Sequence, residues 1–294
     1  MTIHLFRGSK NRVHGLITHA THPWWPSFRG GNSDIYPGRA SLPDGRKVAI
    51  KAIRILHGPP PGKDSKLLKA SPAAEIWSKL RHPNVLPFLG VCDDERVALN
   101  PVLISPFYKF GHIGNYLTIS YIKLELADRD RLVSGVASGL EFIHANEIVH
   151  GDLKVQNVLI DKRGVPCICD FGISKILNCH GYTSLGVGTV PYMAPELFAA
   201  ESVSTTKESD VFSWALLVLE ILTSDRPKRR PTRPFLTSQD VHALRPKRSE
   251  YDVQKVTDDY WAILDRCWAF VPSQRLSMGD VLGSLPDGAA KFTI

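Results

Sequence analysis

The chain has 294 residues, of which 43% are hydrophobic and 22% are charged. These proportions are typical of globular proteins, and they exclude a disordered chain, a collagen repeat and a small disulfide-stapled protein. The length fits two domains, or one domain with two lobes. The formal net charge is +7, and eight Lys and Arg residues gather between 226 and 248. A local basic stretch of this kind differs from a basic groove, so we expect no nucleic-acid partner.

The five cysteines are scattered along the chain without the CxxC spacing of metal and redox sites. This usage predicts reduced cysteines and a cytoplasmic protein. The longest apolar run, residues 214–219, is too short to cross a bilayer, and we expect no membrane partner. The basic stretch at 226–248 contains Arg-Pro-Lys-Arg twice, which leaves nuclear import open beside the simpler interpretation of a solvated loop.

The N-terminal half is rich in predicted strands. Residues 35–55 alternate in polarity around a Pro-Asp-Gly turn at 43–45, which predicts a β-hairpin. A helix is expected over residues 63–80, although Pro72 interrupts the pattern. A further strand-like run covers residues 97–107.

Helical patterns dominate after residue 111. Residues 211–222 are apolar on nearly every side and predict a buried central helix. Shorter helices are expected at 261–270 and 278–282. An amphipathic helix is predicted where apolar residues recur every three or four positions, at Leu132, Val136, Leu140 and Ile143. A small β-rich part therefore precedes a larger helical part.

Several short motifs follow one another in a fixed order. Val-Ala-Ile-Lys ends a predicted strand at Lys51, and residues 150–157 read His-Gly-Asp-Leu-Lys-Val-Gln-Asn. An Asp-Phe-Gly triplet begins at Asp170, 13 residues after Asn157, and residues 194–196 are Ala-Pro-Glu. Any one of these motifs is weak by itself, whereas their joint occurrence in this order is specific.

In this order and spacing the motifs resemble those of eukaryotic protein kinases. GTVPYMAPE at 188–196 and CWAFVPSQRLSM at 267–278 are similar to the tyrosine-kinase-like group of serine/threonine kinases. The resemblance implies an α+β fold with two lobes. It places an extension at 1–27 and the kinase domain at 28–290, with a β-rich N-lobe at 28–107 and a mainly helical C-lobe, including the hinge, at 108–290.

The same resemblance implies transfer of the γ-phosphate of ATP to a serine or threonine hydroxyl of a protein substrate. Asp152 would accept the proton of the hydroxyl, and Lys154 would neutralise charge on the γ-phosphate. Asn157 and Asp170 would supply oxygen ligands to Mg²⁺. The resemblance assigns ATP contacts to Gly30, Gly31, Ile35, Ala49, Lys51, Pro106, Tyr108 and Leu159.

Two further matches concern buried charges. Asp210, near the start of the predicted central helix, would hydrogen-bond the backbone of the catalytic loop. Glu196 and Arg275 would form an ion pair, and because a buried charge without its partner is costly, both members are expected together.

Some positions depart from the family's pattern. Phe28 and Ser33 stand where two glycines of the phosphate-binding loop are expected, and Gly151 replaces the usual arginine before the catalytic aspartate. Ala73 stands where a helix should present a glutamate to the strand lysine, and Glu75 lies two residues away. These departures leave a second interpretation open, a kinase-fold pseudokinase or scaffold that binds nucleotide and partners with little catalysis.

Overall fold

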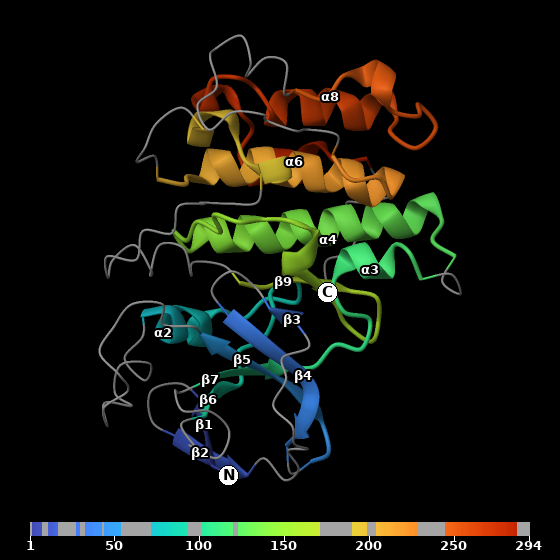
Figure 1. The fold of residues 1–294 in the computed structure, drawn as a ribbon. Coiled ribbons are helices and arrows are strands. Elements are labelled where there is room, and N and C mark those ends of the chain that lie inside the picture. Colours follow the sequence, from blue (N-terminus) through green and yellow to red (C-terminus); the bar gives the residue numbers. More distant parts are fainter. Residues whose placement is uncertain are drawn as a thin grey trace. The chain divides into compact units, whose positions relative to one another are not determined.

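The computed structural model describes residues 2–7, 11–16, 28–29, 33–42, 44–53, 72–92, 102–119, 123–170, 190–198, 204–227 and 245–286. The chain divides into two compact units. Unit 1 consists of residues 1–82 and 86–108, and unit 2 of residues 83–85 and 109–294. Figure 1 shows the long sheet in the first unit and the long helices in the second, so the fold is the small antiparallel sheet and helical lobe that the sequence predicts.

Unit 1 is built on a seven-stranded sheet with the order β2-β1-β6-β7-β5-β4-β3, in which all neighbours are antiparallel. The strands are β1 (Thr2–Arg7), β2 (Asn11–Leu16), β3 (Phe28–Arg29), β4 (Ser33–Ser41), β5 (Lys47–Ile53), β6 (Gly90–Cys92) and β7 (Val102–Pro106). Helix α2 (Pro72–Lys79) belongs to the same unit.

The hairpin predicted over residues 35–55 is confirmed as the pair β4–β5. Its turn requires Gly45, because the backbone there has φ 82°, a left-handed conformation that side chains disfavour. The predicted helix at 63–80 is described only from Pro72, where α2 begins. Proline suits the first turn of a helix, where no intrahelical acceptor awaits its missing N–H.

The N-terminal segment, predicted as an extension, contributes strands β1 and β2 to the sheet. Strand β1 pairs with β6 through Ile3 opposite Cys92 and His4 opposite Val91. The outer edge of β6 is thereby covered, so its backbone groups find partners within the chain.

Alternation along β5 separates the core of unit 1 from the opposite face of its sheet. Val48 and Ile50 are buried, and they pack with Leu42, Cys92, Val102 and Ile104. Ala49 and Lys51 lie on the other face because successive strand residues point to opposite sides. Ile35 pairs with Lys51 across the ladder, so it shares that face.

Unit 2 is mainly helical, and α4, α6 and α8 lie in successive layers (Figure 1). Its α-helices are α3 (Ile113–Tyr116), α4 (Leu126–Ala145), α6 (Lys207–Thr223), α8 (Asp258–Cys267) and α9 (Met278–Ser284). Its strands are β8 (Val158–Ile160) and β9 (Pro166–Ile168). Its 3-10 turns are η2 (Val155–Asn157), η3 (Val190–Tyr192), η4 (Pro195–Phe198), η5 (Arg248–Glu250) and η6 (Pro272–Gln274).

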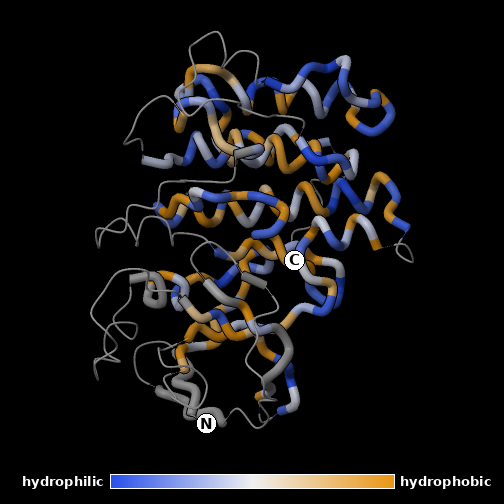
Figure 2. Tube along the Cα trace, viewed as in Figure 1, coloured by the Kyte–Doolittle hydropathy of each residue, from blue (hydrophilic) through white to orange (hydrophobic). Residues whose placement is uncertain are grey.

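The predicted central helix is confirmed as α6, whose residues 209–223 are all buried. The helix begins after Thr206, whose side chain accepts a hydrogen bond from the backbone N–H of Ser209. The apolar positions predicted on one helix at 132–143 are buried on α4. Figure 2 shows hydrophobic residues along both helices.

Helix α8 begins and ends three residues earlier than the predicted range 261–270. It begins at Asp258 because the side chain of Thr257 caps the N–H of Tyr260. Helix α9 begins at the predicted Met278 and ends at Ser284. Across the described ranges, none of the helices combines the length and the apolar character needed to span a bilayer.

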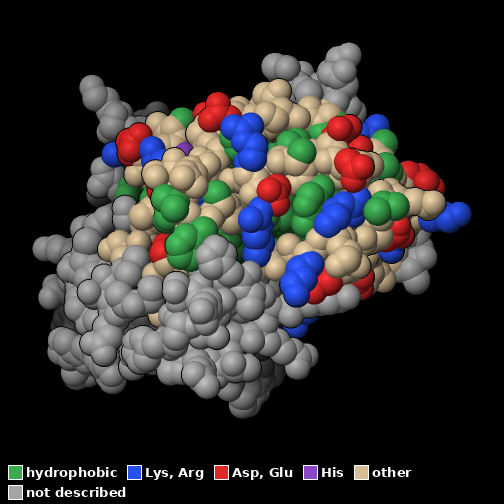
Figure 3. Space-filling model, turned by 90° about the horizontal axis from the view of Figure 1, so that it is seen from above, with side chains coloured by type: hydrophobic (Ala, Val, Ile, Leu, Met, Phe, Trp, Pro, Cys, Tyr) green, Lys and Arg blue, Asp and Glu red, His purple; other side chains and the backbone are tan. Residues whose placement is uncertain are grey.

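The second Arg-Pro-Lys-Arg motif, at 245–248, belongs to the folded surface. Arg245 pairs with Asp265, and Arg248 pairs with Asp258 at 3.1 Å and lies over the ring of Trp261. Figure 3 shows acidic and basic side chains interspersed on the face seen from above, rather than gathered by sign. These contacts place the second motif in a surface segment, as the interpretation of a solvated loop expects.

Gly135 and Gly139 let residues 83–85 approach helix α4 closely. The backbone C=O of Asn84 accepts a hydrogen bond from the N–H of Ile168, and its side chain donates to the C=O of Pro166. A β-carbon added at Gly139 would lie 2.5 Å from the backbone oxygen of Asn84. A side chain at this position would therefore displace the segment from the helix.

We expect Gly139→Ala to lower the free energy of unfolding by about 1–3 kcal/mol, because the added methyl group overpacks the contact with Asn84. The control is Gly283→Ala in α9, where the added β-carbon meets nothing within 4 Å. That helical substitution should be neutral or stabilising by about 0.5–1 kcal/mol. Thermal unfolding of both variants measures the difference. Equal melting temperatures would contradict the close approach.

Candidate catalytic site

Four residues are predicted to act in catalysis or in metal binding, and three of them lie together in the loop between α4 and β8. The Nζ atom of Lys154 is 2.5 Å from Oδ2 of Asp152. The side-chain amide of Asn157 donates to the backbone oxygen of Asp152 at 2.7 Å and to its Oδ2 at 3.3 Å. The carboxylate of Asp152 is therefore held between a cation and an amide, while about a quarter of the side chain stays exposed (26%).

The fourth predicted residue, Asp170, follows the second strand of the β8–β9 hairpin. Val158 pairs with Ile168 at the end of this ladder, and the N–H of Cys169 donates to the backbone oxygen of Asn157 at 2.9 Å. Asn157 and Asp170 therefore leave the hairpin at the same end. Asp170 has φ 64°, a conformation that costs a non-glycine residue about 1–3 kcal/mol and that is typical of functional sites.

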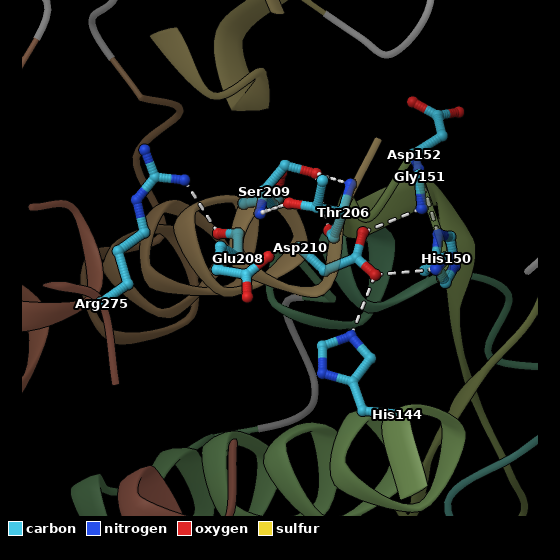
Figure 4. A network of polar contacts seen from close by, with 10 residues as sticks. His144, His150, Gly151, Asp152, Thr206, Glu208, Ser209, Asp210 and Arg275 are labelled. Carbon is cyan, nitrogen blue, oxygen red and sulfur yellow. Dashed lines mark hydrogen bonds and ion pairs between the residues drawn. The ribbon is translucent and has the colours of Figure 1, made fainter. Parts of the chain in front are cut away.

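The carboxylate of Asp210 anchors this loop to α6. Only 1% of Asp210 is exposed. Its Oδ2 accepts from the N–H of His150 at 2.7 Å, and its Oδ1 accepts from the N–H of Gly151 at 2.8 Å (Figure 4). The predicted role of Asp210 is confirmed. Charge-assisted hydrogen bonds of this kind are about twice as strong as neutral ones, which offsets the burial of the charge.

Sequence reasoning missed His144, a third partner of this carboxylate. Its Nε2 lies 3.0 Å from Oδ2 of Asp210, and the side chain is buried in the last turn of α4. One signal was available, because His144 continues the spacing of Val136 and Leu140 by four residues. A histidine on the buried face of a helix needs a hydrogen-bond partner.

The ring of His150 joins the loop between α4 and β8, called the catalytic loop below, to Cys169, the residue after β9. It is fully buried, and its Nδ1 accepts from the N–H of Asp152 at 3.2 Å. Because Nδ1 is the acceptor, the neutral ring carries its proton on Nε2 and donates it to the C=O of Cys169 at 3.0 Å. The backbone N–H of Asp152 and the backbone oxygen of Cys169, the residue before Asp170, therefore both bind this one ring.

Gly151, the departure from the family's arginine, has φ 79°. A β-carbon at this position would lie 3.1 Å from Oγ1 of Thr205. Both the left-handed backbone and the packed neighbour oppose a larger residue. The loop before Asp152 is therefore shaped for glycine.

The predicted ion pair between Glu196 and Arg275 is confirmed. Two nitrogens of Arg275 donate to the two carboxylate oxygens of Glu196, each at 2.7 Å. The arginine also donates to the backbone oxygen of Glu208 at 2.9 Å (Figure 4). Because Glu208 is in the first turn of α6, this arginine fixes η4 to the helix that carries Asp210.

A second buried pair joins η3 to α6. The hydroxyl of Tyr192 donates to the carboxylate of Glu220, and Ser213 donates to the backbone oxygen of Tyr192 at 2.8 Å. Burial raises the pKa of Glu220, and the hydrogen bond from Tyr192 and the charge of Arg226 oppose this increase. Burial and the contact with Glu220 also raise the pKa of Tyr192. The two pairs hold the 190–198 segment on α6.

Of the predicted ATP-binding residues that the structure describes, five belong to unit 1, where Ile35, Ala49 and Lys51 share one face of the sheet. Lys51 is buried, with 9% of it exposed. Pro106 ends β7, and Tyr108 is the last residue of the unit.

The remaining predicted ATP-binding residues are placed differently. Leu159 belongs to unit 2, on β8 opposite Cys167. Gly30 and Gly31 lie outside the described residues, as do the side chains of Ala73 and Glu75. The assignment of these residues to ATP stays a prediction.

Comparison with known proteins gives a clear family match. The family model "Protein tyrosine and serine/threonine kinase" matches residues 29–285. The chain is 28% identical over 243 residues to the serine/threonine-protein kinase STY17 of Arabidopsis thaliana, covering 82% of this chain and 40% of that protein. It is 36% identical over 208 residues to the leucine-rich repeat receptor protein kinase MSP1 of Oryza sativa subsp. japonica, covering 67% and 15%.

A third relative is the probable serine/threonine-protein kinase drkC of Dictyostelium discoideum, with 28% identity over 263 residues. The match covers 87% of this chain and 33% of that protein. The chain therefore spans less than half the length of these relatives.

We expect Gly151→Ala to lower the rate of any chemistry at Asp152 by about tenfold. A displacement of a reacting group by about 1 Å can cost 10²-fold, and the contact of the added β-carbon with Thr205 requires a smaller shift. The matched control is Gly45→Ala, which has a similar φ of 82° and where an added β-carbon meets nothing within 4 Å. Both variants should lose about 1–2 kcal/mol of stability from left-handed strain. Activity and melting temperature are measured together. An equal loss of activity in both variants would count against the role of Gly151.

Proposed function

Because the chain belongs to the protein tyrosine and serine/threonine kinase family, we propose that it transfers the γ-phosphate of ATP to serine or threonine hydroxyls of a protein substrate. The observation that carries the proposal is the arrangement of Asp152, Lys154 and Asn157 in a loop anchored on Asp210. An intact catalytic loop favours catalysis over the alternative of a pseudokinase or scaffold.

Phosphoryl transfer depends mainly on positioning and charge stabilisation, because charge spreads over the γ-phosphate oxygens while little covalent chemistry falls to the protein. Asp152 orients the substrate hydroxyl and accepts its proton. Lys154, 2.5 Å from that carboxylate, neutralises charge that develops on the γ-phosphate. Because the two side chains are in contact, both would act at one reacting centre.

Mg²⁺ is the metal that this donor set fits. Asn157 would bind through Oδ1, because its Nδ2 donates to Asp152, and Asp170 would bind through its carboxylate. Mg²⁺ prefers oxygen ligands and is commonly held by one or two protein side chains together with waters and substrate phosphates. In the described part of the chain, His, Cys, Asp and Glu form no cluster of three that could hold a metal by itself. Bound Mg²⁺ would neutralise phosphate charge.

The unit 1 residues would bind the rest of the nucleotide. Lys51 would pair with the α- and β-phosphates, and Ile35 and Ala49 on the same face would form apolar contacts with adenine. Leu159 would complete the apolar contacts, and the backbone of Pro106 and Tyr108 would hydrogen-bond the adenine edge. Gly30 and Gly31 would cover the phosphates.

The test is phosphate transfer from radiolabelled ATP, with Mg²⁺, to a generic basic protein. Asp152→Asn should lower kcat by about 10²–10⁴-fold, since general-base catalysis contributes about that factor. Binding of ATP, measured by calorimetry, should be unchanged. The control is Asp258→Asn, at a carboxylate that is 97% exposed on the surface. Transfer that survives Asp152→Asn would overturn the role of Asp152, and an inactive wild-type chain would favour the pseudokinase alternative.

We expect phosphate on serine and threonine, and not on tyrosine. Lys154 stands where serine/threonine-directed members of the family carry a lysine, and Thr189, outside the described residues, would form the floor beneath a short hydroxyl side chain. A phenol would reach beyond Asp152. Phosphoamino-acid analysis of a labelled substrate measures the outcome, and mainly phosphotyrosine would contradict it.

A further inference from the structure

We propose that His144 is a positioning residue for phosphoryl transfer, acting through Asp210 on the backbone that carries Asp152. The kinetic part of this proposal rests on the proposed kinase activity. The structural part stands on the contacts of His144 alone, and it can be measured without any turnover.

Three elements meet at one carboxylate. Figure 4 shows the ring of His144 directed from α4 toward Asp210 on α6. Its Nε2 is 3.0 Å from Oδ2, the oxygen that also accepts from the N–H of His150. The other oxygen, Oδ1, accepts from the N–H of Gly151. All three partners of the carboxylate are buried.

The histidine fixes the plane of the carboxylate. Two consecutive backbone N–H groups can be satisfied together only when the two oxygens face them in one orientation, and an aspartate has two rotatable side-chain bonds. A donor from a different helix stabilises that orientation further, because it binds Oδ2 in the same position. His144 therefore orients the acceptor, and the acceptor in turn orients the loop.

The loop depends on this acceptor because residue 151 is glycine. Glycine has the largest backbone freedom of all residues, so its left-handed conformation must be selected by contacts. The N–H of the next residue, Asp152, donates to the ring of His150. A shift of the peptides at 150–151 therefore moves the residue proposed to act as base.

Two variants of His144 separate the effect of its hydrogen-bond donor from the effect of its side-chain volume. His144→Gln keeps an N–H donor at about the place of Nε2, and His144→Leu keeps a buried side chain of similar size without a donor. The matched control is Tyr260→Phe. It removes a partly buried hydrogen bond of 2.7 Å from Tyr260 on α8 to Asp130, which lies on α4 as His144 does, and this bond does not involve Asp210.

We expect His144→Leu to lower kcat by about tenfold, with KM for ATP within about twofold, because orientation of the base is lost while the nucleotide contacts remain. His144→Gln should keep kcat within about threefold of wild type. Tyr260→Phe should lower the melting temperature about as much as His144→Leu without changing kcat. Equal kinetic losses in His144→Leu and Tyr260→Phe, or in the Leu and Gln variants, would overturn the proposal.

Amide hydrogen exchange gives the independent measurement. Peptides covering residues 146–157 should exchange faster in His144→Leu than in wild type, because the N–H groups of His150 and Gly151 lose their fixed acceptor. The same peptides should be unchanged in His144→Gln and Tyr260→Phe. If the wild-type chain transfers no phosphate, the proposed function fails and the exchange data alone decide the role of His144. Unchanged exchange in His144→Leu would refute it.

Discussion

The catalytic loop depends on the hydrogen bonds that its backbone donates to the buried carboxylate of Asp210. A charge taken from water into a protein interior costs several kcal/mol unless hydrogen bonds replace its hydration. Here two backbone N–H groups and one imidazole supply them. Because those N–H groups belong to the two residues before Asp152, the hydrogen bonds that stabilise the charge also position the residue proposed as base.

Helix α6 can hold that charge because burial and polar contacts fix the rest of the helix in place. Its apolar residues are buried along its length, and Thr206 caps its first turn. Arg275 binds the carbonyl of Glu208 in that turn and the carboxylate of Glu196 outside it. Further along, Glu220 and Ser213 hold Tyr192. One helix therefore holds the loop before Asp152 at its start and the 190–198 segment along its length.

The sequence predicts those features that repeat or that stand in a recognisable motif. The apolar run at 211–222 predicts α6, and the motifs predict Asp210 and the partner of Arg275. The contact of His144 was missed because its partner lies 66 residues away and no periodicity links them. Strand β1 was missed because its pairing with β6 joins residues almost ninety positions apart. The sequence shows that residue 151 is a glycine where the family usually has an arginine. It shows neither the left-handed backbone of this residue nor the closeness of Thr205 to it.

The strained backbone of Asp170 is held by the residue before it. Cys169 donates its N–H to the backbone oxygen of Asn157 and accepts the Nε2 proton of His150 at its own oxygen. Both groups of Cys169 are thus committed, and the chain turns sharply at the next residue, where φ becomes 64°. Strain of about 1–3 kcal/mol persists only where surrounding contacts over-determine the conformation. The ring of His150 contributes to that constraint and also accepts from Asp152. The residue proposed as base and the residue proposed as metal ligand are therefore positioned by one imidazole, which lies between their backbones.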